Sequence, residues 1–144
     1  MKRLSVVMIV VIGLSILLPA CGGGGGGGAA TAAKSFFDAF AQLDFTKMKD
    51  LTCAAQKTNI EGISSSLGSL GDASALKNMI KIDTSGLKFE EKSVNGNNAT
   101  VVVSGKMKME MLGKADEQDV NNQELPMVNE GGQWKVCGTS GLLQ

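Results

Sequence analysis

Sulfur-bearing side chains offer most of the chemistry that this sequence could perform. The chain of 144 residues contains three cysteines and eight methionines, but no histidine or tyrosine. The cysteines stand far apart, at Cys21, Cys53 and Cys137. The absent histidine and tyrosine are the side chains that most often partner acid–base chemistry. Carboxylates would therefore have to supply any such chemistry.

The carboxylates of the predicted helices fall at positions that we expect to be solvated. A carboxylate acts as a general base near neutral pH when burial raises its pKa. Asp38, Asp44 and Asp50 instead lie on the polar side or at the boundary of a predicted helix. The sequence therefore predicts no catalytic residue, no cofactor and no enzyme.

Met107, Met109 and Met111 alternate with charged residues, so a strand would place all three thioethers on one face. Soft sulfur ligands of this kind suit Cu(I) or Ag(I). The same methionines continue the Val101–Val103 stripe in register, which is typical of an irregular core that methionine fills. We interpret the stripe as core and predict no metal site, and we keep Cu(I) or Ag(I) binding as an alternative.

Cys21 follows a segment that resembles the signal of bacterial lipoproteins. A basic start at Lys2-Arg3 precedes an apolar run from Leu4 to Leu18, of about 15 residues where a membrane span needs roughly 20. Small residues then precede Cys21, as at a signal-peptide cleavage site. The order Leu18-Pro19-Ala20-Cys21 resembles a lipobox, which implies removal of residues 1–20 and lipid on Cys21. An ordinary signal peptide with an incidental cysteine is the alternative.

The charge of the chain gives no reason to expect a nucleic-acid partner. It holds 14 basic and 14 acidic residues, and removal of Lys2 and Arg3 with the signal leaves 12 against 14, a formal charge of −2. Nucleic-acid binding would favour a clustered basic face. Gly22 to Gly28 follow the lipid site, and a flexible glycine run of this length spans on the order of 15 Å. We expect residues 21–30 to tether a domain to a membrane surface.

Apolar residues at three- and four-residue spacing predict a helix from Ala29 to about Leu43, with Phe36, Phe37 and Phe40 on its buried face. Further helices are expected up to residue 80. Asp44 should end the first helix, and Thr46 should cap a short second one that reaches Cys53. A capping-box spacing at Thr58–Glu61 predicts a third helix to Leu70, and a last helical turn runs from Asp72 to Ile80.

After Ile80 the apolar period changes to two, which predicts strands. The segment around Leu87–Phe89 leads to an Asn95-Gly96 hairpin turn and a return strand to Met111, with Gly105 as a gap or bulge. The segment 114–123 is expected to be a polar loop. Short strands at residues 125–127 and 133–137, joined by a Gly-Gly turn, complete the sheet.

Helices followed by antiparallel strands predict an α+β domain with the helices on one face of the sheet. Three segments carry a resemblance to a known fold: Phe36–Phe40, Leu43–Phe45 and Gly132–Val136. Over about residues 30–138 the chain resembles the nuclear-transport-factor-two-like (cystatin-like) cone fold, and more narrowly the bacterial lipoproteins of unknown function that carry this domain. The resemblance implies a curved sheet wrapped on helices around a conical pocket. The residues that would line it are Phe36, Phe37, Phe40, Met107, Met109 and Trp134.

The same resemblance implies a disulfide between Cys53 and Cys137, because related exported lipoproteins carry such a bridge. Two buried free thiols are the alternative. Strict strand alternation puts Cys137 on the face opposite Trp134 and Val136, so the bond would need a bulge or a helix end that reaches round the sheet edge.

Together these features predict four segments: a signal peptide at 1–20, the tether at 21–30, the cone-like domain at 31–138 and a tail at 139–144. We expect an envelope lipoprotein that is anchored to the cell membrane or outer membrane and faces the periplasm or exterior. Its non-catalytic domain would be a structural or protein-interaction module for an unknown envelope partner. The alternative is a binder of a small apolar ligand, for which Gly62, Gly68 and Gly105 would leave space inside the cone.

Overall fold

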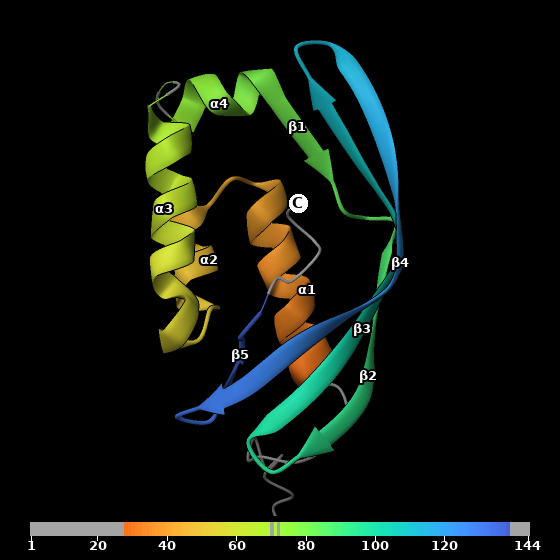
Figure 1. Cartoon of the computed structure of the whole chain (residues 1–144). Helices are drawn as coiled ribbons and strands as arrows, with labels where there is room; N and C mark the ends of the chain where they lie inside the picture. Colours follow the sequence, from red (N-terminus) through yellow and green to blue (C-terminus); the bar gives the residue numbers. More distant parts are fainter. Residues whose placement is uncertain (1–27, 70, 72, 139–144) are drawn as a thin grey trace, which may run out of the picture.

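Helices occupy the first part of the chain and antiparallel strands the second, so the predicted α+β class is confirmed (Figure 1). The computed structural model describes residues 28–69, 71 and 73–138. The predicted signal peptide, Cys21 and the tail at 139–144 lie outside them. The elements are α1 (Gly28–Ala41), α2 (Phe45–Asp50), the 3-10 helix η1 (Ala54–Gln56), α3 (Lys57–Gly68), α4 (Ala73–Met79), β1 (Ile80–Asp83), β2 (Leu87–Asn95), β3 (Asn98–Met111), β4 (Lys114–Glu130) and β5 (Gln133–Val136).

The sheet is strongly curled into a half-barrel around β3 (Figure 1). One edge of β3 pairs with β1 and β2, which lie end to end, so that Ile80 stands opposite Met111 and Leu87 opposite Gly105. The other edge of β3 pairs with β4, and the last residues of β4 pair with β5. Helix α1 lies within the concave side, which gives a cone-like arrangement.

The segment 114–123 corrects the sequence prediction, because it is the first half of β4 and not a polar loop. Its residues pair along β3, with Lys114 opposite Met111 and Asp119 opposite Lys106. Every residue from Lys114 to Asp119 is exposed, so this part of the strand shows no apolar alternation. Ladder hydrogen bonds and ion pairs from Lys106 to Glu117 and Asp119 stabilise it in place of burial.

The predicted gap or bulge at Gly105 corresponds to a bulge beside this residue, with the extra residue in β4 and not in β3. The β3–β4 register shifts between Val103 and Gly105, and β4 turns there at Asn122, whose φ is 49°. Gly105 itself has a φ of 115°, and a Cβ on it would lie 2.2 Å from the Gly86 carbonyl oxygen. Glycine is required because the backbone of Gly86 occupies the place of a side chain.

Glycines do not open the interior in the way that the sequence analysis expected. Gly62 and Gly68 lie on the exposed side of α3, with no atom within 4 Å of a Cβ built on either one. Gly105 lies against the Gly86 backbone and borders an open surface hollow beside Lys106 and Asp119, not an interior pocket. The prediction that these three glycines leave pocket volume is therefore wrong.

Helix α1 begins at Gly28, within the predicted tether 21–30. A Cβ at Gly28 would lie 3.1 Å from the Trp134 indole, so the glycine lets the helix start pack against that ring. The Glu91 carboxylate on β2 accepts hydrogen bonds from the backbone N–H groups of Ala29 and Ala30, at 2.8 and 3.2 Å. A carboxylate at this position also favours the helix through its dipole.

The helix caps differ from the predicted ones. Asp44, and not Thr46, caps α2, because its Oδ1 accepts from the Lys47 N–H at 3.0 Å. Helix α3 starts before Thr58, after Gln56, whose side chain makes no capping hydrogen bond, so the predicted capping box is not formed. Ile80 begins β1 and does not extend a helix. The predicted Asn95–Asn98 hairpin turn is confirmed, with Gly96 at a φ of 59°.

Candidate functional site

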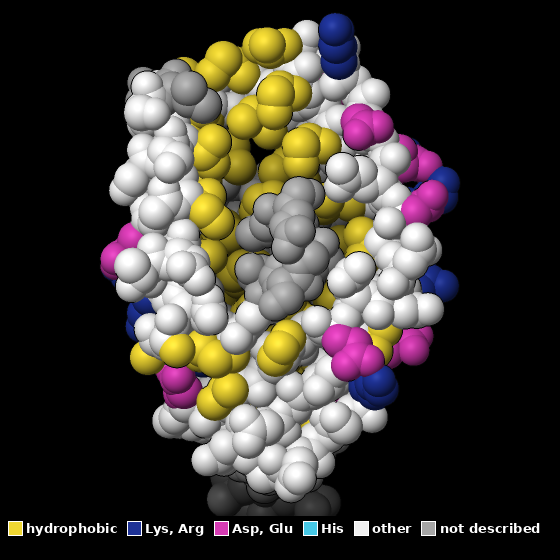
Figure 2. Space-filling model, viewed as in Figure 1, with side chains coloured by type: hydrophobic (Ala, Val, Ile, Leu, Met, Phe, Trp, Pro, Cys, Tyr) yellow, Lys and Arg dark blue, Asp and Glu magenta, His cyan; other side chains and the backbone are white. Residues whose placement is uncertain are grey.

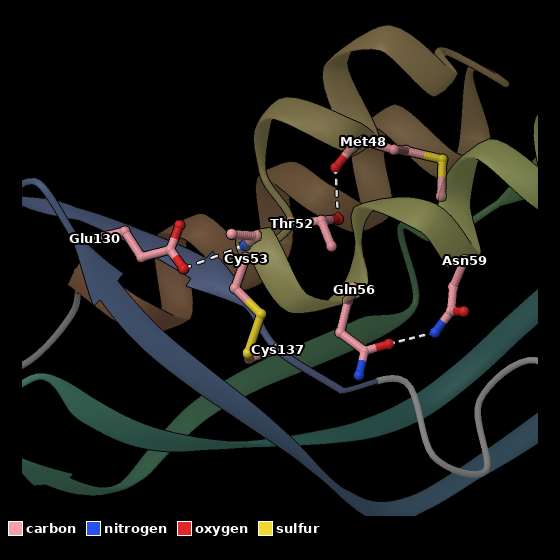
Figure 3. The surroundings of a disulfide bond; sticks show 8 residues. Met48, Thr52, Cys53, Gln56, Asn59, Glu130 and Cys137 are labelled. Carbon is pink, nitrogen blue, oxygen red and sulfur yellow. Dashed lines mark hydrogen bonds between the residues drawn. A yellow bond between two sulfur atoms is a disulfide. The ribbon is translucent and has the colours of Figure 1, made fainter.

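A disulfide joins the segment that follows α2 to the end of the sheet (Figure 3). Cys53 and Cys137 are bonded, with their Cα atoms 5.1 Å apart. The segment that follows α2 runs along the outer edge of β5: Cys53 N–H donates to the Val136 carbonyl at 2.9 Å, and Val136 N–H donates to the Leu51 carbonyl at 2.8 Å. Cys137 lies just past β5. The helix end that reaches the sheet edge therefore resolves the alternation problem, and the free-thiol alternative is wrong.

The residues around the disulfide make contacts that hold the fold together. Cys53 is 1% exposed, and the Thr52 hydroxyl beside it donates to the Met48 carbonyl at 2.7 Å (Figure 3). The Glu130 carboxylate accepts from the Ala54 N–H at 3.2 Å on the other side. The bonded cysteines are 84 residues apart, and closing so long a loop restricts the unfolded chain by about 4–5 kcal/mol in the chain-entropy description. We interpret the bond as a tie between helices and sheet.

The six residues predicted to line a pocket divide into a core group and a rim. Phe36, Phe37 and Met107 are 3%, 4% and 5% exposed and belong to one core cluster. Phe40 and Trp134 are partly buried against that cluster. The rings of Phe36 and Phe37 pack edge to face, with their centroids 5.9 Å apart and their planes at 79°. The structure therefore brings five of the six predicted residues together in packed apolar surroundings.

The methionine stripe leaves the core as β3 approaches its tip. Met107 is buried, Met109 is half-buried and Met111 is 49% exposed. The prediction that all three face the interior is thus right for the first and wrong for the last. Across the ladder they stand opposite Gln118, Asp116 and Lys114. Within the described ranges no group of three or more histidine, cysteine, aspartate or glutamate side chains is placed to hold a metal ion.

The three acids considered for acid–base chemistry have ordinary surface roles. Asp38 pairs with Lys34 at 2.8 Å on α1, and its side chain is 42% exposed. Asp44 caps α2, and Asp50 is exposed at the end of that helix. Among the residues that the structure describes, the buried polar side chains are those of Thr52 and Thr84.

A shallow hollow between α2 and α3 holds the best-defined helix–helix ion pair. The hollow measures about 250 Å³ and is lined partly by Phe45 and Ile60. Lys49 and Glu61 pair across it at 2.6 Å. The hydrogen bond and charge of each partner raise the pKa of the Lys49 ammonium and lower the pKa of the Glu61 carboxyl. Both side chains are about half exposed, so this pair joins two helices and does not form a reactive site.

A second hollow, at the β3–β4 tip, was missed by the sequence reasoning. It measures about 420 Å³ and is lined by Met109, Met111, Leu112, Lys114, Asp116 and Gln118. Leu112 is 75% exposed, more than either of the other large exposed hydrophobic residues of the described chain. The sequence contains one signal for this hollow, which is the single apolar residue Leu112 before Gly113 at the edge of a polar segment. Because the segment 114–123 was predicted to be a loop, this leucine did not indicate a strand tip.

Comparison with known proteins does not identify the chain. No protein-family model matches it, and no curated protein sequence shows significant similarity to it. Within residues 28–69, 71 and 73–138, no helix has the length and apolar character that crossing a membrane requires.

Proposed function

We propose that this protein is a cell-envelope lipoprotein whose cone-like domain acts without catalysis as a protein-interaction or structural module. The order of basic start, apolar run, small residues and cysteine supports a lipid anchor on Cys21. Such an anchor would hold the domain at the bacterial cell membrane or outer membrane, facing the periplasm or exterior. The disulfide fits an exported protein, because disulfides persist in oxidising compartments.

We further propose that the domain belongs to the nuclear-transport-factor-two-like, cystatin-like folds. In support, helices precede the strands and α1 lies inside a strongly curled antiparallel sheet (Figure 1). The packing of three of the residues that carried the resemblance also supports this proposal. Phe36 and Phe37 fill the concave side from α1, and Trp134 packs against the same cluster from β5.

The filled interior is the observation that carries the proposed interaction role. Phe36, Phe37 and Met107 are 3–5% exposed and belong to the same core cluster as Val101 and Val103, which are both 0% exposed. Interiors packed in this way leave few voids larger than a water molecule. A domain whose centre is occupied by its own side chains presents its surface for recognition, which favours a protein partner.

Binding of a small apolar ligand is the second candidate, and one observation favours it. Hydrophobic side chains gather around a hollow on the face shown in Figure 2, over α3, α4 and β1. Phe40 and Ile82 are partly buried and pack against the core. Apolar concavities are common ligand sites. Binding of Cu(I) or Ag(I) by the methionine stripe stays a weaker alternative.

Lysine-reactive crosslinking of intact cells, followed by mass spectrometry of the isolated full-length protein, tests the interaction role. We expect a discrete heavier species that contains a second envelope protein. The same preparation, purified without denaturant, is extracted with organic solvent to recover bound apolar molecules. An apolar molecule recovered in equimolar amount, with no crosslinked protein, would replace the interaction role with ligand binding.

A further inference from the structure

The tip of the β3–β4 hairpin carries exposed apolar surface. Leu112 and Met111 are 75% and 49% exposed, and in the described part of the chain Val94 is the only other large hydrophobic residue with comparable exposure. Together with half-buried Met109 they line the hollow of about 420 Å³, whose other lining residues are Lys114, Asp116 and Gln118. An exposed apolar patch rimmed by polar residues is typical of an interaction site.

The backbone of Leu112 adopts a conformation that is unfavourable for leucine. Its φ is 51°, in the left-handed region that glycine and asparagine adopt readily and leucine rarely does. Two-residue hairpin turns of this kind favour Asn-Gly, and Gly113 already supplies the glycine. Folding alone would therefore favour asparagine at position 112. An exposed leucine in a strained conformation indicates a role outside the fold.

The edge of β4 beside this tip has no partner strand among the residues that the structure describes. β5 pairs only with Met127–Glu130, which leaves the outer edge from Lys114 to Asn121 unpaired. Unpaired edges accept extended segments of other proteins through main-chain hydrogen bonds. The outer edge of β2 differs, because a bulge between Glu91 and Ser93 and the exposed Lys88 protect it from pairing.

The charges on the β4 edge indicate which kind of segment can pair with it. Glu117 and Asp119 already pair with Lys106 and Lys108 of β3, whereas Asp116 has no ion-pair partner in the described ranges, so Asp116 is the acidic charge that a partner can meet. A two-fold antiparallel pairing with a second copy, centred anywhere from residue 116 to 119, would set two acidic side chains directly opposite each other. Like charges in such a pair are destabilising. A segment with basic side chains is complementary to this edge, whereas a second copy is not.

We propose that residues 109–121 form a docking site at which an extended, basic segment of an envelope protein adds as a strand to β4. An apolar side chain of that segment enters the hollow beside Met111 and Leu112, and a basic one faces Asp116. The inference rests on the proposed function, because it specifies where and how the partner of an interaction module binds.

The test places a photoreactive benzoylphenylalanine at Gln118 in the full-length protein and irradiates intact cells. The adduct is then mapped to a residue of the partner. The matched control carries the same photoreactive group at Lys88 on the edge of β2. We expect an adduct from Gln118 that maps to an extended segment with lysine or arginine at alternate positions, and none from Lys88.

Two further variants separate docking from folding. Leu112→Asn suits the left-handed turn, so we expect an unchanged or higher melting temperature together with about a tenfold loss of adduct, the loss expected for one buried leucine side chain. Val94→Thr removes exposed apolar surface elsewhere and should leave the adduct unchanged. Asp116→Lys should also weaken the adduct, and a lysine-to-glutamate change at the mapped partner residue should restore it.

The outcomes distinguish this inference from the proposed function. If lysine-reactive crosslinking captures a partner while Gln118 gives no adduct, the docking site is wrong and the interaction role stands. An adduct with a second copy, or one that Leu112→Asn and Asp116→Lys leave unchanged, also overturns the site. If neither the lysine-reactive crosslinker nor the photoreactive group at Gln118 captures any protein, the interaction role itself fails.

Discussion

At the scale of single residues, the contact between Gly105 and Gly86 fixes how the sheet bends. Gly105 of β3 lies against the Gly86 carbonyl oxygen, so that no side chain fits at position 105. The left-handed φ of 115° adds a second reason, since residues with a Cβ adopt it only under strain. Glycine at positions 86 and 105 thus lets the two backbones approach closely, beside the bulge in β4.

We predict that Gly105→Ala lowers the free energy of unfolding by roughly 2–4 kcal/mol, because strain at the positive φ adds to the clash with Gly86. Urea denaturation of the disulfide-bonded domain measures the change. Gly62→Ala is the matched control. It lies within α3 with open space around its Cα, so it should raise the free energy of unfolding by about 0.5–1 kcal/mol. Equal effects of the two variants would contradict the role of Gly105.

The aromatic residues show what sequence periodicity can predict. Phe36 and Phe37 recur with the helical period among small alanines, so their burial followed from spacing alone. Met111 has the same alternation as Met107 but lies beyond the part of the sheet that α1 covers. Strand alternation identifies a face, and only the tertiary structure determines how far along the strand that face is covered.

At the scale of elements, β4 shows why half of a strand was not predicted. Its C-terminal half buries Leu125 and Met127, which gave the expected strand signal. The stretch from Lys114 to Asp119 has no buried residue and is stabilised through its neighbour β3, which a local pattern cannot show. The disulfide follows the same rule, because pairing Cys53 with Cys137 required a helix end to reach the edge of β5. Local sequence patterns therefore did not predict the contacts between segments that lie far apart in the chain, namely the pairing of the first half of β4 and the position of the helix end beside β5.

We predict that acid weakens the N-terminal half of β4 through Glu117. The hydrogen bond and charge of Lys106 hold the pKa of the Glu117 carboxyl below its ordinary value of 4.5. A carboxyl whose pKa is lowered by folding contributes stability above its unfolded pKa, and this contribution is lost as the pH falls through the folded pKa. Wild-type protein should therefore lose more stability than Glu117→Gln between about pH 6 and about pH 3.

Hydrogen exchange of the β4 amides at the two pH values measures this loss locally. Asp116→Asn is the matched control, because Asp116 lies beside Glu117 yet forms no ion pair within the described chain. It should retain the wild-type pH response. Raising the salt concentration should shrink the difference between wild type and Glu117→Gln, since exposed pairs are screened. An identical acid response of wild type and Glu117→Gln would contradict the assignment.

At the scale of the whole molecule, the start of α1 and the β3–β4 tip lie at opposite ends (Figure 1). The β2–β3 turn lies at the same end as the start of α1. A chain anchored through Cys21, a few residues before Gly28, would therefore place the proposed docking site on the side away from the bilayer. The proposed anchor would thus join the domain at the end opposite the proposed docking site, so that the membrane need not cover the β4 edge.

The anchor itself gives the last prediction. Bacterial lipoproteins, which the start of this chain resembles, carry at least two acyl chains on the cysteine. Two chains hold a protein stably on a membrane, whereas a single myristoyl chain binds only marginally. Cys21→Ala should therefore abolish incorporation of labelled fatty acid and either release the protein from the membrane fraction or leave residues 1–20 attached. Cell fractionation and intact mass measure these outcomes.

The matched control is the double variant Cys53→Ala, Cys137→Ala, which removes the disulfide and leaves Cys21 in place. It should retain the fatty-acid label and the membrane location even where the domain is less stable, because the signal acts before the domain folds. Loss of label in the control would mean that lipidation depends on the folded domain. Unchanged label in Cys21→Ala would overturn the anchor, and with it the orientation that directs the β4 edge away from the membrane.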